Sequence, residues 1–349
     1  DMTDHVQDLH SNIPNLMHPD TPEGKDESEN VVVRSWGEIP KFDFPLKDHM
    51  ELGTALDLID VETAARITGS RFGYLKNELA LMEYGLVLHV MQMLGDPDTI
   101  SKILPGCNPT AFTPIVPPVM IKPEIFRKAA RLSEATKDER YYLPADDLYL
   151  IGSAEHTMSP YYMDTTFEES ELPKRFVGFS TAFRREAGTY GKDMHGILRV
   201  HQFDKIELES FSLPEDGGKE QDLFVAIQEK LLQDLELPYQ VMMMCTGDMG
   251  DPDYRQIDMN TWIPSQEKYR ETHTSDYVTD YQSRRLNTKV KRADGTKDFV
   301  HMNDATALAI GRTLIAIVEN YQQEDGSVRV PKILQKYVGK ETIKSQASN

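Results

Sequence analysis

The chain has 349 residues, and 38 Lys and Arg against 57 Asp and Glu give it a formal net charge of −19. Hydrophobic residues make up 39% of it, which is enough for a sizeable core but too few for a membrane protein, and the longest apolar stretch (84–94) is about half of the ~20 residues that a bilayer span needs. Two cysteines exclude a disulfide framework and a cysteine-rich zinc site, and no signal peptide is recognisable, so we expect a cytoplasmic protein with no membrane partner.

The first half of the chain predicts helices and one unusual strand. Apolar residues recur at helical spacing over 51–67 and 77–94, and the second segment is apolar on most faces, as is typical of a buried helix. Three prolines among β-branched residues in TAFTPIVPPVMI (110–121) predict a strand at a sheet edge or an interface. The expected order is an irregular lead-in (1–30), a strand from 31 with a proline-containing connection to 42, a helix over 51–67 whose second half is capped by Asp60, the buried helix over 77–94, the strand over 110–121 and a helix over 125–132.

From residue 148 onward, strands dominate. Residues 177–186 and 197–211 alternate between polar and apolar positions, and the glycine-containing link over 187–196 predicts that they form a long hairpin. The other expected elements are a strand over 148–153 leading into a helix at 154–163, a helix over 217–237, strands over 239–246 and 256–264, and a helix over 308–323. This grouping predicts an α+β fold, an antiparallel sheet flanked by helices.

The hairpin carries the first candidate site, because alternate residues of a strand share a face. If the two strands present the same face, it holds two arginines, an aromatic ring, a lysine and two carboxylates: Arg184, Glu186, Arg199, Phe203, Lys205 and Glu207. Arginines match phosphate oxygens and an aromatic ring can stack on a base, so a nucleotide on the sheet is one interpretation; a surface of cross-strand salt bridges is the other. The sequence has no GxxxxGK[ST] or GxGxxG, so neither a P-loop nor a Rossmann site is supported.

Three further segments each allow two interpretations. The carboxylate of SAEHT (153–157) could hold an ammonium group, or its serine could cap the following helix. Glu271 and Thr274 could share a hard cation such as Mg²⁺, or mark a solvated strand end. Arg312 begins an apolar helix, where a cation opposes the macrodipole unless a ligand phosphate lies beside it.

Charge along the chain is uneven. Residues 174–205 hold seven Lys and Arg against three Asp and Glu, and a second basic stretch covers 284–297. The overall acidity argues against sequence-independent nucleic-acid binding. The basic stretches indicate either a site for a small anion or solvated basic edges.

The joint order of these segments resembles the catalytic domain of the seryl-tRNA synthetase family, a class II aminoacyl-tRNA synthetase family. The resemblance begins at IPNLMHPDTPEGKDESENVVVRSWG (13–37) and runs to the C-terminus. AFRREAGTYGKDMHGILRVHQFDKIEL resembles motif 2 (about 177–211), NDATALAIGRTLIAIVENYQQEDGSVRVP resembles motif 3 (about 303–331), and residues about 110–121 take the place of motif 1, which forms the dimer interface in this class. The resemblance implies a class II catalytic domain over 13–349, with residues 1–12 as a lead-in.

For the amino-acid side of the site, the resemblance assigns five residues besides the motif 2 arginine. Ser153, Ala154 and Glu155 stand at the family's Thr-x-Glu loop, which resembles a clamp on the serine α-amino group. Glu207 matches the carboxylate that recognises the serine hydroxyl, and Thr306 a hydroxyl-bearing position beside it.

For the ATP side, Arg184 matches the motif 2 arginine that holds the α-phosphate and the reacting serine carboxylate, and Arg312 the motif 3 arginine for the γ-phosphate. These two are the expected catalytic residues. Glu186 matches the reader of the adenine amino group and Phe203 the ring on which adenine stacks, while Glu271 and Thr274 match positions that hold Mg²⁺ with ATP. The remaining expected ATP-binding positions are Arg185, Arg199, Val200, Thr272 and His273.

The resemblance therefore implies a homodimeric enzyme that uses ATP and Mg²⁺, without zinc. L-serine would be converted to seryl-adenylate and pyrophosphate, and the serine then transferred to the 3′ end of tRNA(Ser). Two alternatives remain: a serine-activating relative that loads a carrier protein, and a binding paralogue without turnover.

Several residues depart from the family pattern. Ser153 stands where Thr is usual, Thr272–His273–Thr274 replace Ile-Ser-Ser, and Asp304 stands where Asn is common. Family members also carry an N-terminal coiled-coil arm that grips tRNA, whereas the acidic 12-residue segment DMTDHVQDLHSN, with three Asp and no Lys or Arg, precedes the catalytic opening here. We expect the second step to be impaired if the arm is missing.

Overall fold

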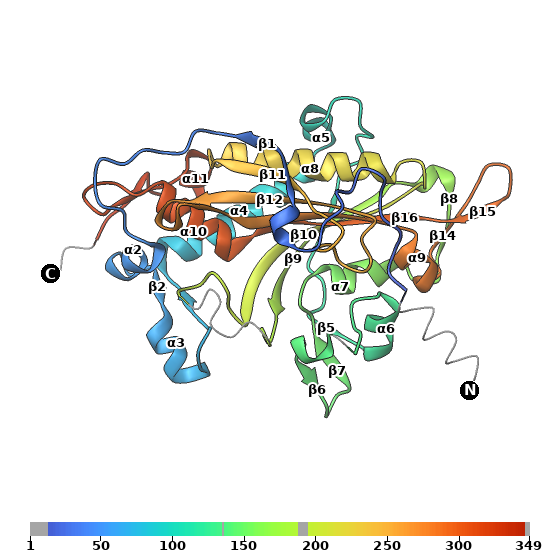
Figure 1. The fold of residues 1–349 in the computed structure, drawn as a ribbon, viewed down its shortest axis with the longest axis horizontal. Helices are drawn as coiled ribbons and strands as arrows, with labels where there is room; N and C mark the ends of the chain where they lie inside the picture. Colours follow the sequence, from blue (N-terminus) through green and yellow to red (C-terminus); the bar gives the residue numbers. More distant parts are fainter. Residues whose placement is uncertain (1–12, 135, 188–194, 346–349) are drawn as a thin grey trace.

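An eight-stranded sheet forms the centre of the computed structural model, which describes residues 13–134, 136–187 and 195–345 (Figure 1). Neighbouring strands are antiparallel except the outermost pair, β4 and β9, which is parallel. In spatial order the strands are β1 (Val31–Trp36), β11 (Tyr239–Met243), β12 (Arg255–Ile263), β13 (Lys268–Thr279), β16 (His301–Ala309), β10 (Gln202–Ser212), β9 (Lys174–Phe183) and β4 (Thr113–Ile115). The expected α+β class with a mainly antiparallel sheet is confirmed.

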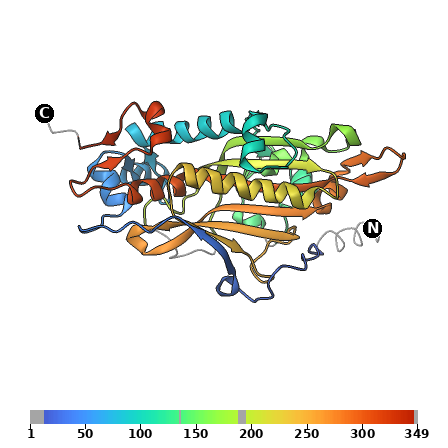
Figure 2. The ribbon, with the colours of Figure 1, turned by 90° about the horizontal axis from the view of Figure 1, so that it is seen from above.

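Alternation along the central strands gives the sheet one apolar and one polar face. Ile206 and Leu208 of β10 are fully buried in the main core, whereas the intervening Glu207 points to the other face. Helix α8 (Gly217–Asp234) lies along the apolar face, where it packs on β13 and β16 (Figures 1 and 2). Helices α4 (Asn77–Leu94) and α10 (Ile310–Asn320) contribute to the same core.

Short elements gather on the polar side of the sheet, opposite α8 (Figure 1). They are α6 (Pro123–Lys128), α7 (Glu155–Met158) with the 3₁₀ turn Ser159–Tyr162, and the small sheet of β5 (Met120–Ile121), β7 (Leu148–Leu150) and β6 (Tyr142–Leu143). The remaining helices and strands are α2 (His49–Ala55), β2 (Ile59–Asp60), α3 (Val61–Thr68), β3 (Tyr74–Leu75), α5 (Pro97–Ile103), β8 (Thr166–Glu168), α9 (Tyr281–Leu286), β14 (Lys289–Lys291), β15 (Lys297–Phe299), β17 (Val328–Arg329), α11 (Gln335–Val338) and β18 (Thr342–Ile343). Within the described part of the chain, no helix is long and apolar enough to cross a bilayer.

Several predicted elements differ in extent from those observed. The single helix expected over 51–67 is wrong: α2 ends at Ala55, Asp57 has a positive φ of 57°, and β2 separates α2 from α3. Asp60 does cap α3, because its side chain accepts a hydrogen bond from the amide of Thr63. The segment 110–121 divides into β4 and β5, with β4 at the sheet edge as expected.

The helices expected over 125–132 and 154–163 are shorter than predicted. The first ends at Lys128 and the second at Met158, where it continues as a 3₁₀ turn. The helix expected from 308 begins at Ile310, because residues 308 and 309 still belong to β16.

The hairpin of β9 and β10 is confirmed, but its strands are shorter at the connection. β9 ends at Phe183 and β10 begins at Gln202, so Arg184, Glu186 and Arg199 lie in the connection and do not belong to the strands. The part of the predicted link at 188–194 and the lead-in at 1–12 lie outside the described residues.

Candidate active site

A cavity of about 330 Å³ opens on the polar face of the sheet. Its walls come from β10, β13 and β16, from the start of α10, and from the connection between β9 and β10. The predicted site residues that line it are Glu155, Arg184, Glu186, Arg199, Val200, Phe203, Glu271, Thr272, Thr274, Thr306 and Arg312. Segments far apart in sequence thus meet at one cavity.

An arginine and an aromatic ring form one wall. Phe203 lies on β10, and the guanidinium carbon of Arg184 is 5.3 Å from the centre of its ring. The Nε of Arg184 donates a hydrogen bond to the carbonyl of Gly152 at 3.1 Å. A planar cation held beside a ring offers both a partner for an anion and a stacking surface.

Two ion pairs bring further charge to the same side. Nη1 of Arg199 donates to Oε2 of Glu186 at 2.6 Å, and Glu186 has a positive φ of 52°. Nη1 of Arg312 donates to the carbonyl of Glu271 at 2.8 Å and lies 3.2 Å from its carboxylate. The side chain of Glu271 is 53% exposed. Partial desolvation by the cavity wall raises its pKa, but Arg312 and Arg184 outweigh this effect, so that the pKa is lowered. This side of the cavity combines three arginines with two carboxylates.

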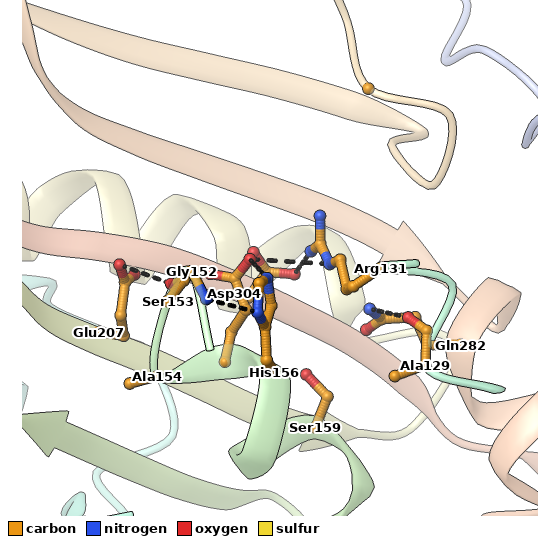
Figure 3. A network of polar contacts seen from close by, with 12 residues as sticks. Ala129, Arg131, Gly152, Ser153, Ala154, His156, Ser159, Glu207, Gln282 and Asp304 are labelled. Atoms are coloured by element: carbon orange, nitrogen blue, oxygen red, sulfur yellow. Dashed lines mark hydrogen bonds and ion pairs between the residues drawn. The ribbon is translucent and has the colours of Figure 1, made fainter. Parts of the chain in front are cut away.

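The opposite side is built around the buried carboxylate of Glu207 (Figure 3). Its Oε1 accepts hydrogen bonds from the hydroxyls of Ser153 and Thr306, both at 3.1 Å, and forms an ion pair with Lys205. Burial raises the pKa of Glu207, and Lys205 opposes that shift. Its Oε2 is buried behind the cavity wall and has no hydrogen-bond partner among the described residues, so it retains the capacity to accept one hydroxyl.

Glu155 lies at the start of α7, beside Glu207. The Ser153 hydroxyl, whose single proton is shared between Glu155 and Glu207, lies 2.8 Å from Oε2 of Glu155. The side chain of Glu155 is 13% exposed. Burial raises the pKa of Glu155, but Arg131 and Lys205 reverse the effect and hold it well below the usual range. An ionised carboxylate at the cavity wall is suited to bind an ammonium group.

Five predicted site residues do not line the cavity. Ser153 and Glu207 lie directly behind its wall and contact residues that form it, as described above. Ala154 is buried in a second apolar cluster. The guanidinium of Arg185 lies 5.8 Å from the ring of Tyr141.

His273 is also absent from the cavity wall. Its ring is fully buried, and Nδ1 lies 2.7 Å from the hydroxyl of Thr272. Burial lowers the pKa of His273 to about 3, so the ring is neutral at physiological pH.

Sequence reasoning assigned no role to four charged residues of the cavity wall: Arg131, Asp204, Asp276 and Asp304. Asp304 was noted as a departure from the family pattern, but no partner for it was expected. It lies on β16, and its Oδ2 accepts a hydrogen bond from Nη2 of Arg131 at 2.6 Å (Figure 3). Strand alternation could have placed Asp304 beside Thr306, whereas no pattern in the sequence marks Arg131.

Oxygen donors for a hard cation are present but few. Glu271 and Thr274 both line the cavity, and carboxylate and hydroxyl oxygens suit Mg²⁺. Among residues 13–134, 136–187 and 195–345, no three His, Cys, Asp or Glu side chains are grouped so as to hold a metal ion. A cation that also binds substrate phosphates needs only one or two protein carboxylates, so the donor set fits Mg²⁺ arriving with a nucleotide.

Comparison with known proteins gives consistent matches. A family model described as the tRNA synthetase class II core domain (G, H, P, S and T) matches residues 139–321, just over half of the chain. The serine–tRNA ligase of Hydrogenobaculum sp. (strain Y04AAS1) is 39% identical over 339 residues, which are 97% of this chain and 77% of that protein. The serine–tRNA ligase of Sulfurihydrogenibium sp. (strain YO3AOP1) is 42% identical over 326 residues, 93% of this chain and 75% of that protein.

Solved structures agree with these sequence matches. Seryl-tRNA synthetase from Pyrococcus horikoshii, crystallised as a complex with ATP, superposes with a TM-score of 0.91 at 35% identity and covers 99% of this chain and 79% of its own. The cytoplasmic serine–tRNA ligase of Naegleria fowleri, in complex with AMP, gives a TM-score of 0.88 at 30% identity with the same coverage.

Proposed function

Since the chain belongs to the serine–tRNA ligase family of class II aminoacyl-tRNA synthetases, and is thus a ligase that forms aminoacyl-tRNA, we propose that its cavity binds ATP and L-serine side by side. The observation that carries this proposal is the division of one cavity into two kinds of wall. One wall has three arginines and the ring of Phe203, with its two glutamates paired to arginine, and the other has the carboxylate of Glu155 and the hydroxyl of Thr306 in front of Glu207. The arginine wall suits a nucleoside triphosphate, and the carboxylate wall suits a small ammonium compound that carries a hydroxyl.

The amino acid is held by the carboxylate wall. Glu155 binds the ammonium group of serine, and the free oxygen of Glu207 accepts its hydroxyl. Thr306 and Ser153 orient Glu207 through the hydrogen bonds at its other oxygen. Alanine would leave that buried oxygen without a donor, which is a costly mismatch.

The nucleotide is held by the arginine wall. Adenine stacks on Phe203 and its amino group faces Glu186, while Arg184 contacts the α-phosphate and the serine carboxylate, and Arg312 the γ-phosphate. Arg199 meets the distal phosphates, and Val200 and Thr272 complete the cavity-lining part of the proposed ATP-binding set. Arg185 and His273 also belong to the proposed set but lie off the cavity wall, so they would act on ATP only through neighbouring residues.

In the reaction, a carboxylate oxygen of serine attacks the α-phosphorus of ATP while the bond to pyrophosphate breaks. Arg184 positions the two anions and stabilises the charge that develops on the phosphoryl oxygens. Glu271 and Thr274 would hold Mg²⁺, which supplies charge neutralisation to the phosphates when it is bound.

Several wider assignments rest on the family alone. We assign residues 13–349 to the catalytic domain, with tRNA(Ser) as the acceptor in the second step and the cytoplasm as the compartment. The chain is proposed to work as a homodimer joined through residues 110–121.

Titration calorimetry with non-hydrolysable sulfamoyl analogues of seryl-, alanyl- and threonyl-adenylate tests this function. The seryl analogue should bind once per chain, and about 100-fold or more tightly than the alanyl analogue, as expected when a site pairs a substrate hydroxyl. Equal affinity for the three analogues, or no binding to the folded chain, would contradict the proposed site.

A further inference from the structure

We propose that Arg131 and Asp304 form a positioning pair for the serine subsite. Asp304 holds the guanidinium of Arg131 by a direct hydrogen bond, and this leaves the Glu155 carboxylate available to the ammonium group of the substrate. The inference rests on the proposed function and adds two positioning residues to it.

The distances show that Arg131 interacts more closely with one carboxylate than with the other. Nη2 of Arg131 lies 2.6 Å from Oδ2 of Asp304, a short charge-assisted hydrogen bond. Nε of Arg131 lies 3.7 Å from Oε1 of Glu155, which is too far for a hydrogen bond. Nε also lacks a hydrogen-bond partner in the described ranges, so the arginine is engaged with Asp304 and poised beside Glu155.

Because all three side chains are largely buried, the way Arg131 interacts with the two carboxylates affects the charge at the site. The side chains of Arg131, Asp304 and Glu155 are 14%, 3% and 13% exposed, respectively. Water therefore screens their charges poorly, and any change in how the arginine is shared alters the charge that Glu155 offers to a ligand.

Backbone contacts fix the arginine at this place. Ala130 has a positive φ of 57°, and the amide of Arg131 donates to the carbonyl of Phe126 at 3.2 Å. The side chain of Gln282, from α9, donates to the carbonyl of Ala129 at 3.0 Å (Figure 3). The segment is thus held from two sides, and the guanidinium enters the cavity wall from a defined direction.

Other carboxylates surround Asp304 on the sheet. In the strand register, Asp304 stands opposite Glu209 of β10 and Asp276 of β13. Glu209 accepts a hydrogen bond from Ser159 at 2.8 Å. Burial raises the pKa of Asp304 and Arg131 opposes that shift, so the 2.6 Å contact with the guanidinium is what favours the anion. If Asp304 loses its charge, Arg131 loses its hydrogen-bonded anion, and Glu155 is the carboxylate already within 4 Å of it.

Two variants separate positioning from structural support: Asp304→Asn alone, and the double variant that combines Asp304→Asn with Arg131→Met. Pyrophosphate exchange measured over a range of serine and of ATP concentrations gives separate KM values. D304N should raise the KM for serine on the order of tenfold or more, because Arg131 turns to Glu155. Its KM for ATP should stay within about twofold of the parent value. The double variant has no arginine to block Glu155, so its KM for serine should fall back close to the value of the parent.

Glu209→Gln is the matched control, because it removes a neighbouring buried carboxylate that does not bond Arg131; we expect its serine KM within about twofold of the parent. A double variant no better than D304N, or equal losses in the serine and ATP constants, would overturn the positioning role alone. Failure of the unmodified chain to bind serine in titration calorimetry would instead overturn both this role and the proposed function.

Discussion

Glu207 shows how single atoms define the amino-acid subsite. One of its oxygens is engaged by two hydroxyls and a lysine, and the other has no partner in the described part of the chain. Glu207→Gln keeps the shape but replaces an acceptor with a donor. We expect kcat/KM for serine to fall about 100-fold in pyrophosphate exchange, as for other sites that pair a substrate hydroxyl. Glu209→Gln, two residues along the same strand, should change it little; equal losses in both variants would contradict the role of Glu207.

His273 predicts a pH dependence of stability. Its folded-state pKa of about 3 lies below the ordinary 6.5, because the ring is buried. Below pH 6.5 the unfolded chain binds the extra proton first, so the stability contributed by neutral His273 is present above pH 6.5 and is lost as the pH falls toward 3.

Chemical denaturation at pH 7 and pH 5 tests this for the parent and for His273→Asn. The parent should lose up to about 1.4 kcal/mol more unfolding free energy per pH unit than the variant over that window. Parallel pH profiles would show that His273 is not a buried neutral group.

The resemblance of the motifs to a known family predicted much of the site, but not all of the charged residues in its wall. Arg184, Phe203 and Arg312 were assigned to ATP from the resemblance of the motifs to a known family, and all three line the cavity. Arg131 could not be predicted, because an arginine after a short helix has no periodic or motif context. Its position depends on the turn at Ala130 and on the contact with Asp304 from a distant strand.

At the scale of elements, α7 must stay close to β9 for Glu155 to reach the cavity. A Cβ at Gly178 of β9 would lie 2.2 Å from the sulfur of Met158, the last residue of α7, which is fully buried. Gly178→Ala should therefore displace α7, lower the unfolding free energy by about 1–3 kcal/mol and raise the KM for serine.

Gly218→Ala in the first turn of α8 is the control, because nothing lies within 4 Å of its Cβ. This helical substitution should be neutral or stabilising. If the Gly178→Ala and Gly218→Ala variants unfold at the same temperature and bind serine with the same affinity, the contact between Gly178 and Met158 does not position α7.

The polarity of the central strands explains which elements were predicted poorly. β13 was recognised only as a possible strand end, and β16 was overlooked, because both carry charged and hydroxyl side chains toward the cavity. In contrast, α4 was predicted with its observed bounds, since its apolar residues are packed into the core. The alternation of apolar and polar residues that predicts a strand is less regular where the strand contributes side chains to a polar site.

At the scale of the molecule, exposed apolar side chains lie on α4 and in the segment 110–121. Leu81, Tyr84 and Leu88 share one face of α4 and are 47%, 62% and 47% exposed, and Val116 is 78% exposed. We expect this surface to join two chains. Val116→Asp should yield monomers in light scattering after gel filtration, with unchanged thermal stability at low concentration. A monomeric parent would contradict the proposed dimer.

The most direct test of the whole account is amino-acid-dependent ATP–pyrophosphate exchange without tRNA. Serine, threonine, alanine and glycine are compared in parallel, with Mg²⁺ present. The account predicts exchange with serine and rates for the other three that are lower by about 100-fold or more. A folded chain that shows no exchange with any of them, or exchanges all four equally, would contradict the assignment of the cavity to serine activation.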